Sequence, residues 1–405
     1  MYKLILAGYL SIICLNITAQ DELTVVYYNL LNYPGSTPER ITYLRNIVQY
    51  TRPDLFVVNE LQSDDAANDI LNNALNQYGI NDYQKAAFTD GPDSDNMLFY
   101  NSDRIKLLNQ DTIKTALRYI NKYGVYYNDP GLPEHKDTVF LEVFSLHLRP
   151  NPGDSAEQLR LDDCILLRDY IDTKTKGSNI IAGGDLNLYS SSEPAYSKLL
   201  NEGIYKLYDP VNTPGNWSGD SSFAGIHTQS TRLTSFGGGA SGGLDDRFDF
   251  ILVSGDIMDG ANDIEYISGS YKAFGNDGMH FGDSLTALAL NPNIPDSVTY
   301  SLYNMSDHLP VMLKLAVNTK PIANPAVYPN PNDGEFTVKF LLDTLQKVNL
   351  RLNDLAGRSV FAEEITGNSG VNEVLIGMQH LSQGVYLFQI RGTIMIYNQK
   401  IVVFK

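Results

Sequence analysis

Cysteine is scarce in this chain of 405 residues, which contains only two. Cys14 falls in an apolar run near the start, from Leu4 to Ile17, and Cys164 stands alone in the remainder. A single thiol cannot form a disulfide within one chain, so removal of the first segment would leave no internal disulfide. Stability is therefore expected to come from a buried core, a bound metal ion, or both.

Basic residues are also in short supply. Lys and Arg number 30 against 47 Asp and Glu, and the formal net charge is −17. This charge argues against a broad basic surface, so any contact with nucleic acid must be local and assisted by metal ions. A phosphodiester substrate is not excluded, because divalent cations invert the sign of an acidic cleft.

Two common catalytic arrangements and the usual zinc patterns find no support. The sequence has no Gly-Lys-Ser or Gly-Lys-Thr phosphate loop, and Cys164 falls in a predicted helix, which does not favour a cysteine nucleophile. The six histidines include no pair at helical spacing, and there are only two cysteines, so a zinc site is not favoured.

The chain begins with a short apolar segment. Residues 1–20 combine an early lysine, the apolar run and a small-residue end at Thr18-Ala19, which is typical of a secretory signal peptide. A membrane anchor is the alternative, but the run is short for a span and Asn16 interrupts it. Lipidation at Cys14 is disfavoured because Ile13 precedes it, where a small residue is needed. We therefore expect an exported protein without a transmembrane anchor.

The composition is that of a folded protein, with 43% hydrophobic and 11% aromatic residues, and the length suits two or three domains. After the signal peptide the pattern predicts strand, helix, strand, helix. The strands are Leu23–Leu31 and Asp54–Glu60; a capping box of Ser36 and Glu39 opens the first helix, and Ala67–Leu75 marks the second.

The middle of the chain predicts strands joined by turns. A capping box of Ser155 and Gln158 opens a helix through Tyr170, and Pro194 starts a short helix. Residues 201–245 and 255–305 are expected to be irregular. The predicted strands are Asn96–Asn101, Asp137–Leu148, Ser178–Asp185, Asp246–Ser254 and Leu309–Val317.

The composition changes at residues 318–327, where Lys320–Pro325 predicts an extended linker. The last part, residues 328–405, has no helical periodicity and contains alternating segments separated by Gly, Asn and Asp. A small all-β sandwich is predicted there.

Acid, amide and imidazole side chains lie at the ends of the predicted strands. In a mixed sheet, carboxyl ends of some strands share an edge with amino ends of others, so these groups could converge. Taken alone, each also fits a turn, a surface acid or a core histidine. Convergent oxygen ligands suit Mg²⁺ or Mn²⁺. The residues are Asn29, Glu60, His147, Asp185, Asn187, Asp249, Asp307 and His308.

Six short motifs carry a family resemblance. In chain order they are Tyr28-Asn29, Val58–Glu60, Ser145–His147, Gly184–Asn187, Arg247–Asp249 and Ser306–His308. Together they resemble the endonuclease/exonuclease/phosphatase family. The resemblance implies an α/β fold, a DNase I-like four-layer α/β/β/α sandwich over residues 21–317, and Mg²⁺-dependent phosphoester hydrolysis.

The same resemblance implies a role for each residue. Glu60 would ligate the metal with Asn29 and Asp307 close by, and Asp185 with Asn187 would orient the attacking water and a phosphate oxygen. His308, held by Asp249, would act on protons at the scissile phosphate. His147 would donate a hydrogen bond to a phosphate oxygen. The family often has a basic residue near the first histidine, a place that Arg149 could fill, although Arg160 competes for it. For a nuclease, Arg232 and Arg247 would add local positive charge near the substrate.

Three functions remain open. A secreted nuclease acting on DNA or RNA is favoured, since extracellular nucleic acid is the commonest phosphodiester that such an enzyme meets. A sphingomyelinase-like or other phosphatase is the second, and an exposed aromatic hairpin, for which Tyr119–Tyr127 is the candidate, would favour it. An inactive surface binding module is the third. A structural Ca²⁺ at Asp90–Asp95 is disfavoured, because no Glu closes the loop.

The tail has a resemblance of its own. Val327–Val338, Leu355–Arg358, Gly384–Leu387 and the last residues to Lys405 are similar to the type A sorting domain of the type IX secretion system. This implies a Bacteroidetes-type cell, the type IX machinery as a partner, and release or surface attachment after export.

Overall fold

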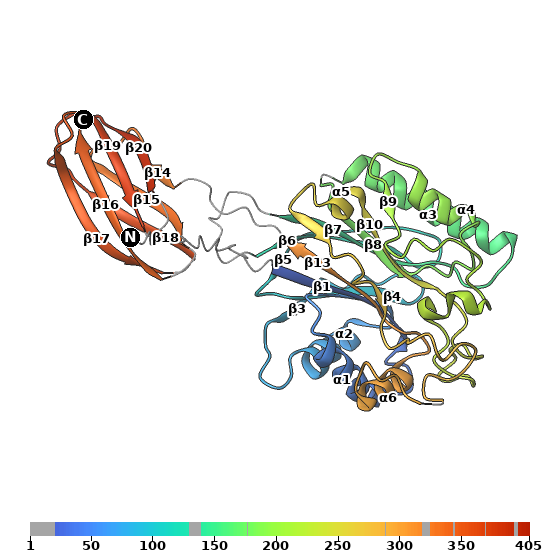
Figure 1. Cartoon of the computed structure of the whole chain (residues 1–405). Coiled ribbons are helices and arrows are strands. Elements are labelled where there is room, and N and C mark those ends of the chain that lie inside the picture. The colour runs from blue at the N-terminus through green and yellow to red at the C-terminus, as the bar shows by residue number, and fades with distance from the viewer. Residues whose placement is uncertain are drawn as a thin grey trace, which may run out of the picture.

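The computed structural model describes residues 21–128, 139–175, 177–287, 289–317, 325–342, 345–368, 370–392 and 396–405. The expected signal peptide, most of the expected linker and the start of the strand predicted at Asp137 lie outside these residues. The amino-terminal domain and the carboxy-terminal domain each have their own sheets and core (Figure 1).

Two mixed sheets form the centre of the amino-terminal domain. The first sheet has the strand order β11-β13-β1-β2-β4-β3, with β12 beside β13. Its strands are β1 Asp21–Tyr33, β2 Leu55–Leu61, β3 Tyr83–Lys85, β4 Asp95–Asn101, β11 Ile264–Tyr266, β12 Lys272–Ala273 and β13 Val311–Val317.

The second sheet has the strand order β5-β6-β7-β8-β10-β9. Parallel pairs join β1 to β2 and β7 to β8, whereas β13 and β10 run antiparallel to their neighbours β1 and β8. The strands are β5 Ile105–Ile113, β6 Ile120–Tyr127, β7 Phe140–His147, β8 Ile180–Asp185, β9 Leu207–Tyr208 and β10 Asp249–Ser254.

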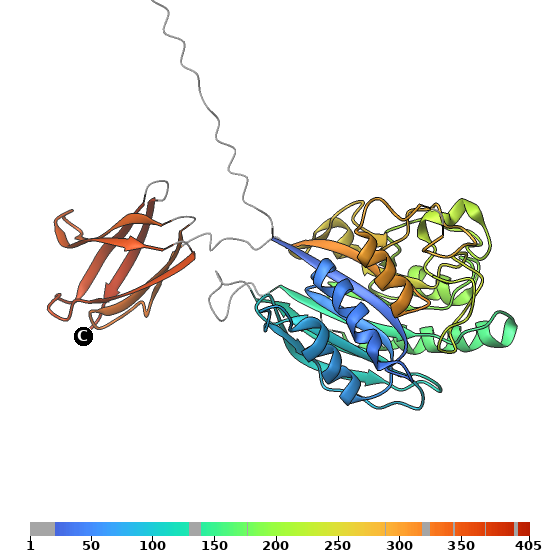
Figure 2. The same cartoon turned by 90° about the horizontal axis from the view of Figure 1, so that it is seen from below.

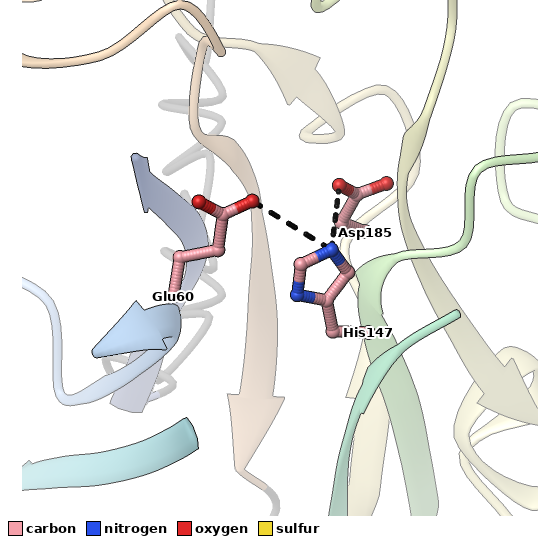
Figure 3. A group of neighbouring side chains, drawn as sticks. All are labelled: Glu60, His147 and Asp185. Carbon is pink, nitrogen blue, oxygen red and sulfur yellow. Dashed lines mark ion pairs between the residues drawn. The ribbon is translucent and has the colours of Figure 1, made fainter. Parts of the chain in front are cut away.

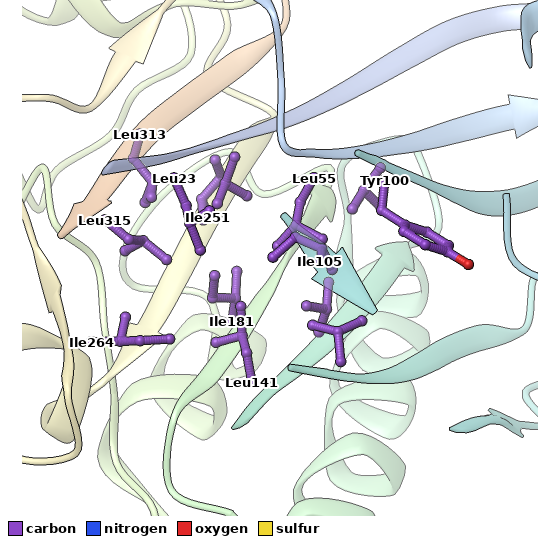
Figure 4. Close-up of a cluster of buried hydrophobic side chains, with 14 of the residues drawn as sticks. Leu23, Leu55, Tyr100, Ile105, Leu141, Ile181, Ile251, Ile264, Leu313 and Leu315 are labelled. Atoms are coloured by element: carbon purple, nitrogen blue, oxygen red, sulfur yellow. The ribbon is translucent and has the colours of Figure 1, made fainter. Parts of the chain in front are cut away.

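The two sheets pack face to face around an apolar core, part of which is drawn in Figure 4. Successive side chains of a strand point to opposite faces, so Val25 and Tyr27 enter this inner core while Val26 and Tyr28 face the outer helices. A strand covered on both faces must be apolar throughout, which is why β1 reads as a continuous run rather than an alternating one.

Helices cover both outer faces. The first sheet carries α1 Ile41–Thr51, α2 Asp64–Ile70 with its π-helical extension Leu71–Leu75, and α6 Asp296–Met305, seen together in Figure 2. The second carries α3 Asp154–Lys174 and α4 Pro194–Asn201. The remaining helices are the 3₁₀ turns Pro38–Arg40 and Ser221–Ile226 and the short α5 Gly255–Asp259. The predicted four-layer α/β/β/α sandwich is confirmed.

Some local predictions were wrong. The side chains of Ser36 and Ser155 do not cap their helices: the first helix begins with a 3₁₀ turn after Thr37, and α3 begins after Gly153. The region 255–305, expected to be irregular, contains α6, whose Val298, Leu302 and Met305 pack against the first sheet. For α6, tertiary packing rather than a local cap determines where the helix lies.

The carboxy-terminal domain is all β, as predicted. It has a three-stranded sheet of β14 Ala326–Tyr328, β15 Glu335–Leu342 and β18 Gly370–Gly377. A four-stranded sheet contains β16 Gln346–Asp354, β17 Ser359–Gly367, β19 Gly384–Arg391 and β20 Ile396–Val403. One core, which includes Phe336 and Phe388, lies between them.

In the part of the chain that the structure describes, we find no helix with the length and apolar content of a membrane span.

Candidate active site

Strand ends of both sheets meet along one edge of the sandwich. His147 of β7 is paired in register with Asp185 of β8, and Asp185 with Asp249 of β10. In the first sheet Asn29 is paired with Asn59, the residue before Glu60. The antiparallel strands β10 and β13 enter at this edge where the parallel strands leave it. The predicted convergence of strand ends is therefore present.

Three side chains at this edge form a compact group, drawn in Figure 3. Glu60 comes from β2, His147 from β7 and Asp185 from β8. His147 Nε2 lies 3.7 Å from Glu60 Oε1 and 3.4 Å from Asp185 Oδ2. One ligand atom from each residue falls within 4.8 Å of the other two. The group therefore joins the two sheets through side chains that can all bind a cation.

The backbone is strained at this edge. Glu60 has φ of 60° and Asn187 has φ of 49°, in the left-handed region that side chains with a Cβ rarely adopt. Each such residue costs of the order of 1–3 kcal/mol, and such residues cluster at functional sites. The turn at Glu60 coincides with a shift in the pairing of β2 with both its neighbours. The strained residues therefore lie at the carboxylates of the site: one is Glu60 itself, and the other, Asn187, follows Asp185 by two residues.

Asn29 lies between the Glu60 and Asp185 carboxylates and bridges them. Its Nδ2 donates to Glu60 Oε1 at 2.9 Å and to Asp185 Oδ2 at 3.0 Å, and its Oδ1 accepts from the Leu31 N–H. Both donors therefore face carboxylates, and the amide oxygen faces away from them. In this geometry Asn29 orients Glu60 and Asp185, whereas the sequence had placed it beside the metal.

Asp185 is supported from behind by Asn59, which is completely buried. Asn59 Oδ1 accepts from the Asp185 N–H at 3.1 Å, and its Nδ2 donates to Asn96 and Ser145. Gly184 must be glycine here, since an added Cβ would lie 2.0 Å from the Leu146 carbonyl oxygen. A buried, fully bonded amide network of this kind fixes the carboxylate that it supports.

His308 is held in one orientation by Asp249. Its Nδ1 lies 2.7 Å from Asp249 Oδ2, and its Nε2 faces inward, 3.7 Å from Asp185 Oδ2. The contact on which the predicted role of Asp249 depends is therefore present. The Gln229 amide lies 2.6 Å from the same Nε2, a neighbour that no sequence pattern indicated.

Asp307 is held by the glycine-rich loop Phe236–Leu244. Its Oδ2 accepts from the Ala240 N–H at 2.6 Å and from Gln229 at 3.3 Å. Gly239 lies so close that an added Cβ would be 2.7 Å from Asp307 Oδ2. The glycine at this position is therefore required for close backbone approach to the carboxylate.

Burial and mutual repulsion shift the acidities at the site. Burial raises the pKa of Glu60, and it raises the pKa of Asp185 to about 7 even though His308 lowers it. Burial lowers the pKa of His147 well below its usual value, with Arg118 and His308 adding to the effect. Burial lowers the pKa of His308 too, but the carboxylates, Asp249 first, outweigh it and hold this pKa well above the usual value. The site gathers buried negative charge that a cation would stabilise.

A divalent metal ion fits this donor set. Two carboxylates and a neutral imidazole are the deprotonated forms that metal binding requires. The Nδ1 of His147 is buried and has no hydrogen-bond partner among the described residues, so the ring is not committed elsewhere. The acid-rich turn Asp90–Asp95 is different: Asp93 pairs with Arg118, and Asp95 accepts from the Gly91 N–H.

Asn187 is positioned beside Asp185, two residues further along the chain. Its N–H donates to Asp185 Oδ1 at 3.0 Å, and its Nδ2 donates to the Leu148 carbonyl oxygen at 3.2 Å. The amide is therefore fixed at the same edge as the carboxylate.

Two of the three arginines expected at the substrate are occupied elsewhere. Arg247, 1% exposed, makes two hydrogen bonds to Asp209 at 2.8 and 2.9 Å and stacks on Phe250 and Trp217. Arg232 is stacked against the rings of Phe236 and Tyr303. Both guanidiniums stabilise the packing of the domain, because each is stacked on aromatic rings and that of Arg247 is also paired with a carboxylate.

Arg149 is half-buried, and its charge acts on Asp163 of α3, whose pKa it lowers against the larger effect of burial. Arg118, which is paired with Asp93, also acts on the site: it lowers the pKa of both Glu60 and His147. Arg118 Nη1 donates to the Leu148 carbonyl oxygen, next to His147. The sequence indicated a basic residue near the first histidine. It could not place Arg118, because β6 and β7 are brought together only by the fold.

The Arg247–Asp209 pair yields a stability prediction. Asp209→Ala leaves a buried cation unpaired, so we expect a loss of about 3–5 kcal/mol in the free energy of unfolding. The single tryptophan, Trp217, lies 5.3 Å from the Arg247 guanidinium, so its fluorescence reports unfolding of this domain in urea. Asp169→Ala, on the exposed surface of α3, is the control and should change stability by less than about 0.5 kcal/mol. Equal effects would contradict the prediction.

A four-layer sandwich with acid, amide and imidazole groups at one edge of its paired sheets defines a class of hydrolase fold. Residues 26–308 match the endonuclease/exonuclease/phosphatase family, and the chain belongs to this family. Its members are phosphoester hydrolases that depend on divalent metal ions. Residues 326–404 match the secretion system C-terminal sorting domain. A domain of this kind directs export, through its secretion machinery, to the cell surface or the extracellular space.

Solved structures of similar fold come from several organisms. A humanized TDP2 of D. rerio matches with a TM-score of 0.48 and 13% identity, covering 73% of this chain and 99% of that chain. A family member from Bacteroides thetaiotaomicron matches with a TM-score of 0.45 and 15% identity, covering 74% of this chain and 98% of that chain. The human Nocturnin catalytic domain matches with a TM-score of 0.44 and 17% identity, covering 74% of this chain and 97% of that chain. No curated protein matches the sequence.

Proposed function

We propose that this protein is an exported nuclease that hydrolyses phosphodiester bonds of DNA or RNA with Mg²⁺ or Mn²⁺. The observation that carries the proposal is the position of Asp185. Its carboxylate lies between two imidazoles, His147 and His308, and beside the Glu60 carboxylate. Metal ligands and proton-handling groups therefore surround one small volume, as phosphoester hydrolysis requires.

Each side chain has a part in the proposed chemistry. Glu60 and Asp185 would hold the metal with His147 beside them, and Asp307 would add its charge. A bound divalent ion would neutralise charge on the phosphate oxygens. Because Asp249 occupies Nδ1, Nε2 is the ring nitrogen that His308 would present to a phosphate oxygen, in place of its contact with Gln229. The raised pKa favours the protonated ring, which donates a hydrogen bond.

The attacking water is assigned to Asp185 and Asn187, which are held side by side. Arg118 supplies positive charge on the side of His147, where a non-bridging oxygen would lie. Positioning of this kind, with charge aimed at the oxygens, accounts for most catalysis of phosphoryl transfer. Arg118 therefore takes the place that the sequence had given to Arg149.

Nucleic acid is favoured over a lipid headgroup by the fate of the aromatic segment Tyr119–Tyr127. Most of it forms β6, which pairs with β5 and β7, and Tyr123 and Tyr127 are buried. It therefore does not form the exposed aromatic hairpin that would have favoured the sphingomyelinase-like alternative. We keep the division into a signal peptide (1–20), a catalytic domain (21–317), a linker (318–327) and a sorting domain (328–405) as part of the proposal, except that the sorting domain begins with β14 at Ala326, inside the expected linker.

A substrate panel tests the function. The purified protein is incubated with DNA, RNA, sphingomyelin and a simple phosphate monoester, each with Mg²⁺, with Mn²⁺ or with EDTA. We expect cleavage of nucleic acid with either metal and a loss of at least about 10³-fold with EDTA, because the uncompensated carboxylates then repel the phosphate.

Three results would count against this proposal. Turnover that survives EDTA excludes the metal mechanism. Cleavage of sphingomyelin or the monoester in preference to nucleic acid favours the second function. Binding without turnover on every substrate favours the surface binding module.

A further inference from the structure

We propose that Arg40 is a positioning residue that sets the geometry of the metal site by binding the backbone behind it, an inference that rests on the proposed function. Arg40 lies at the junction of the first 3₁₀ turn and α1, and it is 3% exposed. It touches neither of the two carboxylates that face His147. Its effect is on the two backbone segments that carry the site's acidic side chains.

All five N–H donors of the guanidinium are used. Nε donates to Thr37 Oγ1 at 2.8 Å, and the other four donate to backbone carbonyl oxygens. Those acceptors are Leu30 at 2.8 Å, Met305 at 2.6 Å, Leu31 at 2.9 Å and Pro34 at 3.4 Å. Lysine has three donors on one point charge and cannot reproduce this planar pattern.

The first segment held by Arg40 is the end of β1. Leu31 and Asn32 have φ of 49° and 48°, so the chain there is in the left-handed region at two successive residues without glycine. In this conformation the Asn32 N–H donates to Glu60 Oε2 at 2.9 Å. Arg40 binds the Leu31 carbonyl and therefore stabilises the turn that fixes Glu60.

The second segment is Met305–His308. Arg40 binds the Met305 carbonyl, and the next residue, Ser306, donates from Oγ to the Asn29 carbonyl oxygen at 2.7 Å. The His308 N–H in turn donates to Ser306 Oγ. Arg40 therefore joins the strand end that carries Asn29 to the segment that carries Asp307 and His308.

Charge supports the same conclusion. Burial lowers the pKa of Arg40, and among the carboxylates Asp307 does most to raise it. A fixed positive charge beneath Asp307 offsets part of the negative charge of the site without being accessible to substrate. Residues behind the ligands commonly set metal affinity in this way, and their replacement typically costs about 10–100-fold.

The test uses the full chain with Arg40→Lys and Arg40→Met. Matched controls are Arg52→Lys and Arg52→Met at the exposed C-cap of the same helix. Mn²⁺ binding without substrate is measured by isothermal titration calorimetry, and kcat and KM are measured on nucleic acid. We expect the Kd for Mn²⁺ to rise by about 10-fold in Arg40→Lys and more in Arg40→Met. The kcat should fall while KM changes little, and the controls should match the wild type.

Unchanged Mn²⁺ affinity in a folded Arg40→Lys, with an active wild type, overturns this inference and leaves the proposed function standing. A wild type that neither binds Mn²⁺ nor cleaves nucleic acid overturns both. If both Arg40 variants fail to fold, Ser306→Ala decides, since it breaks the link to Asn29 in the same junction. Weaker Mn²⁺ binding in Ser306→Ala supports the inference, and unchanged binding overturns it.

Discussion

Replacing Asp185 by asparagine is expected to lower kcat for phosphodiester hydrolysis by about 10³-fold, equivalent to about 4 kcal/mol of transition-state stabilisation. The substitution keeps the volume of the side chain and removes its charge. Asp185 Oδ2 accepts from Asn29 and lies near both imidazoles. One change would therefore remove a proposed metal ligand, the negative charge facing His308 Nε2 and the support for the attacking water.

The measurement is kcat on the preferred nucleic acid at saturating Mg²⁺, together with the melting temperature. Asp169→Asn on the exposed face of α3 makes the same chemical change away from the site and should leave kcat unchanged. An Asp185→Asn protein that retains more than about a tenth of the wild-type kcat would contradict the assignment, because the carboxylate would then be dispensable.

Removing the imidazole of His308 is expected to lower kcat by about 10²–10⁴-fold, the usual effect of losing a positioned proton donor. Asp249→Asn should lower kcat for the same reason, since the Asp249 carboxylate orients the ring through Nδ1. The double variant His308→Ala/Asp249→Asn should be no slower than His308→Ala. Groups that act as a unit are not additive.

His380→Ala, at an exposed histidine of the carboxy-terminal domain, is the matched control. The double-variant comparison separates this model from independent roles. If the effects of His308→Ala and Asp249→Asn on kcat multiply, Asp249 contributes through a partner other than His308, and the role proposed for Asp249 is wrong.

Many residues at the active-site edge of the two sheets could be predicted from the sequence, because the ends of buried strands can be recognised from the local pattern of apolar and polar residues. Gly184-Asp185 follows a buried apolar run, and Ser306-Asp307-His308 precedes another. α6 was missed although Val298, Leu302 and Met305 repeat at helical spacing after a Pro-Asp start, since the surrounding loops masked a short pattern.

The basic residues were the least predictable part. Sequence distance favoured Arg149, two residues from His147, but a guanidinium acts through space. Arg118 reaches the site from the bend just before β6. Arg247 sits inside a recognised motif and is nevertheless committed to Asp209, 38 positions away. Which cation is free for a substrate depends on partners that no local pattern reveals.

The sequence by itself determined the alternation of strands and helices and the acid, amide and imidazole groups at the strand ends, because periodicity and residue identity are local properties. The four-layer arrangement and the family followed from the resemblance that the six motifs carry. Only the tertiary structure decided that Asn29 orients the carboxylates, that Gln229 contacts His308 and that Arg40 joins the strand ends. Hydrogen-bond direction and burial are set by neighbours distant in the chain, and the fold alone brings those neighbours together.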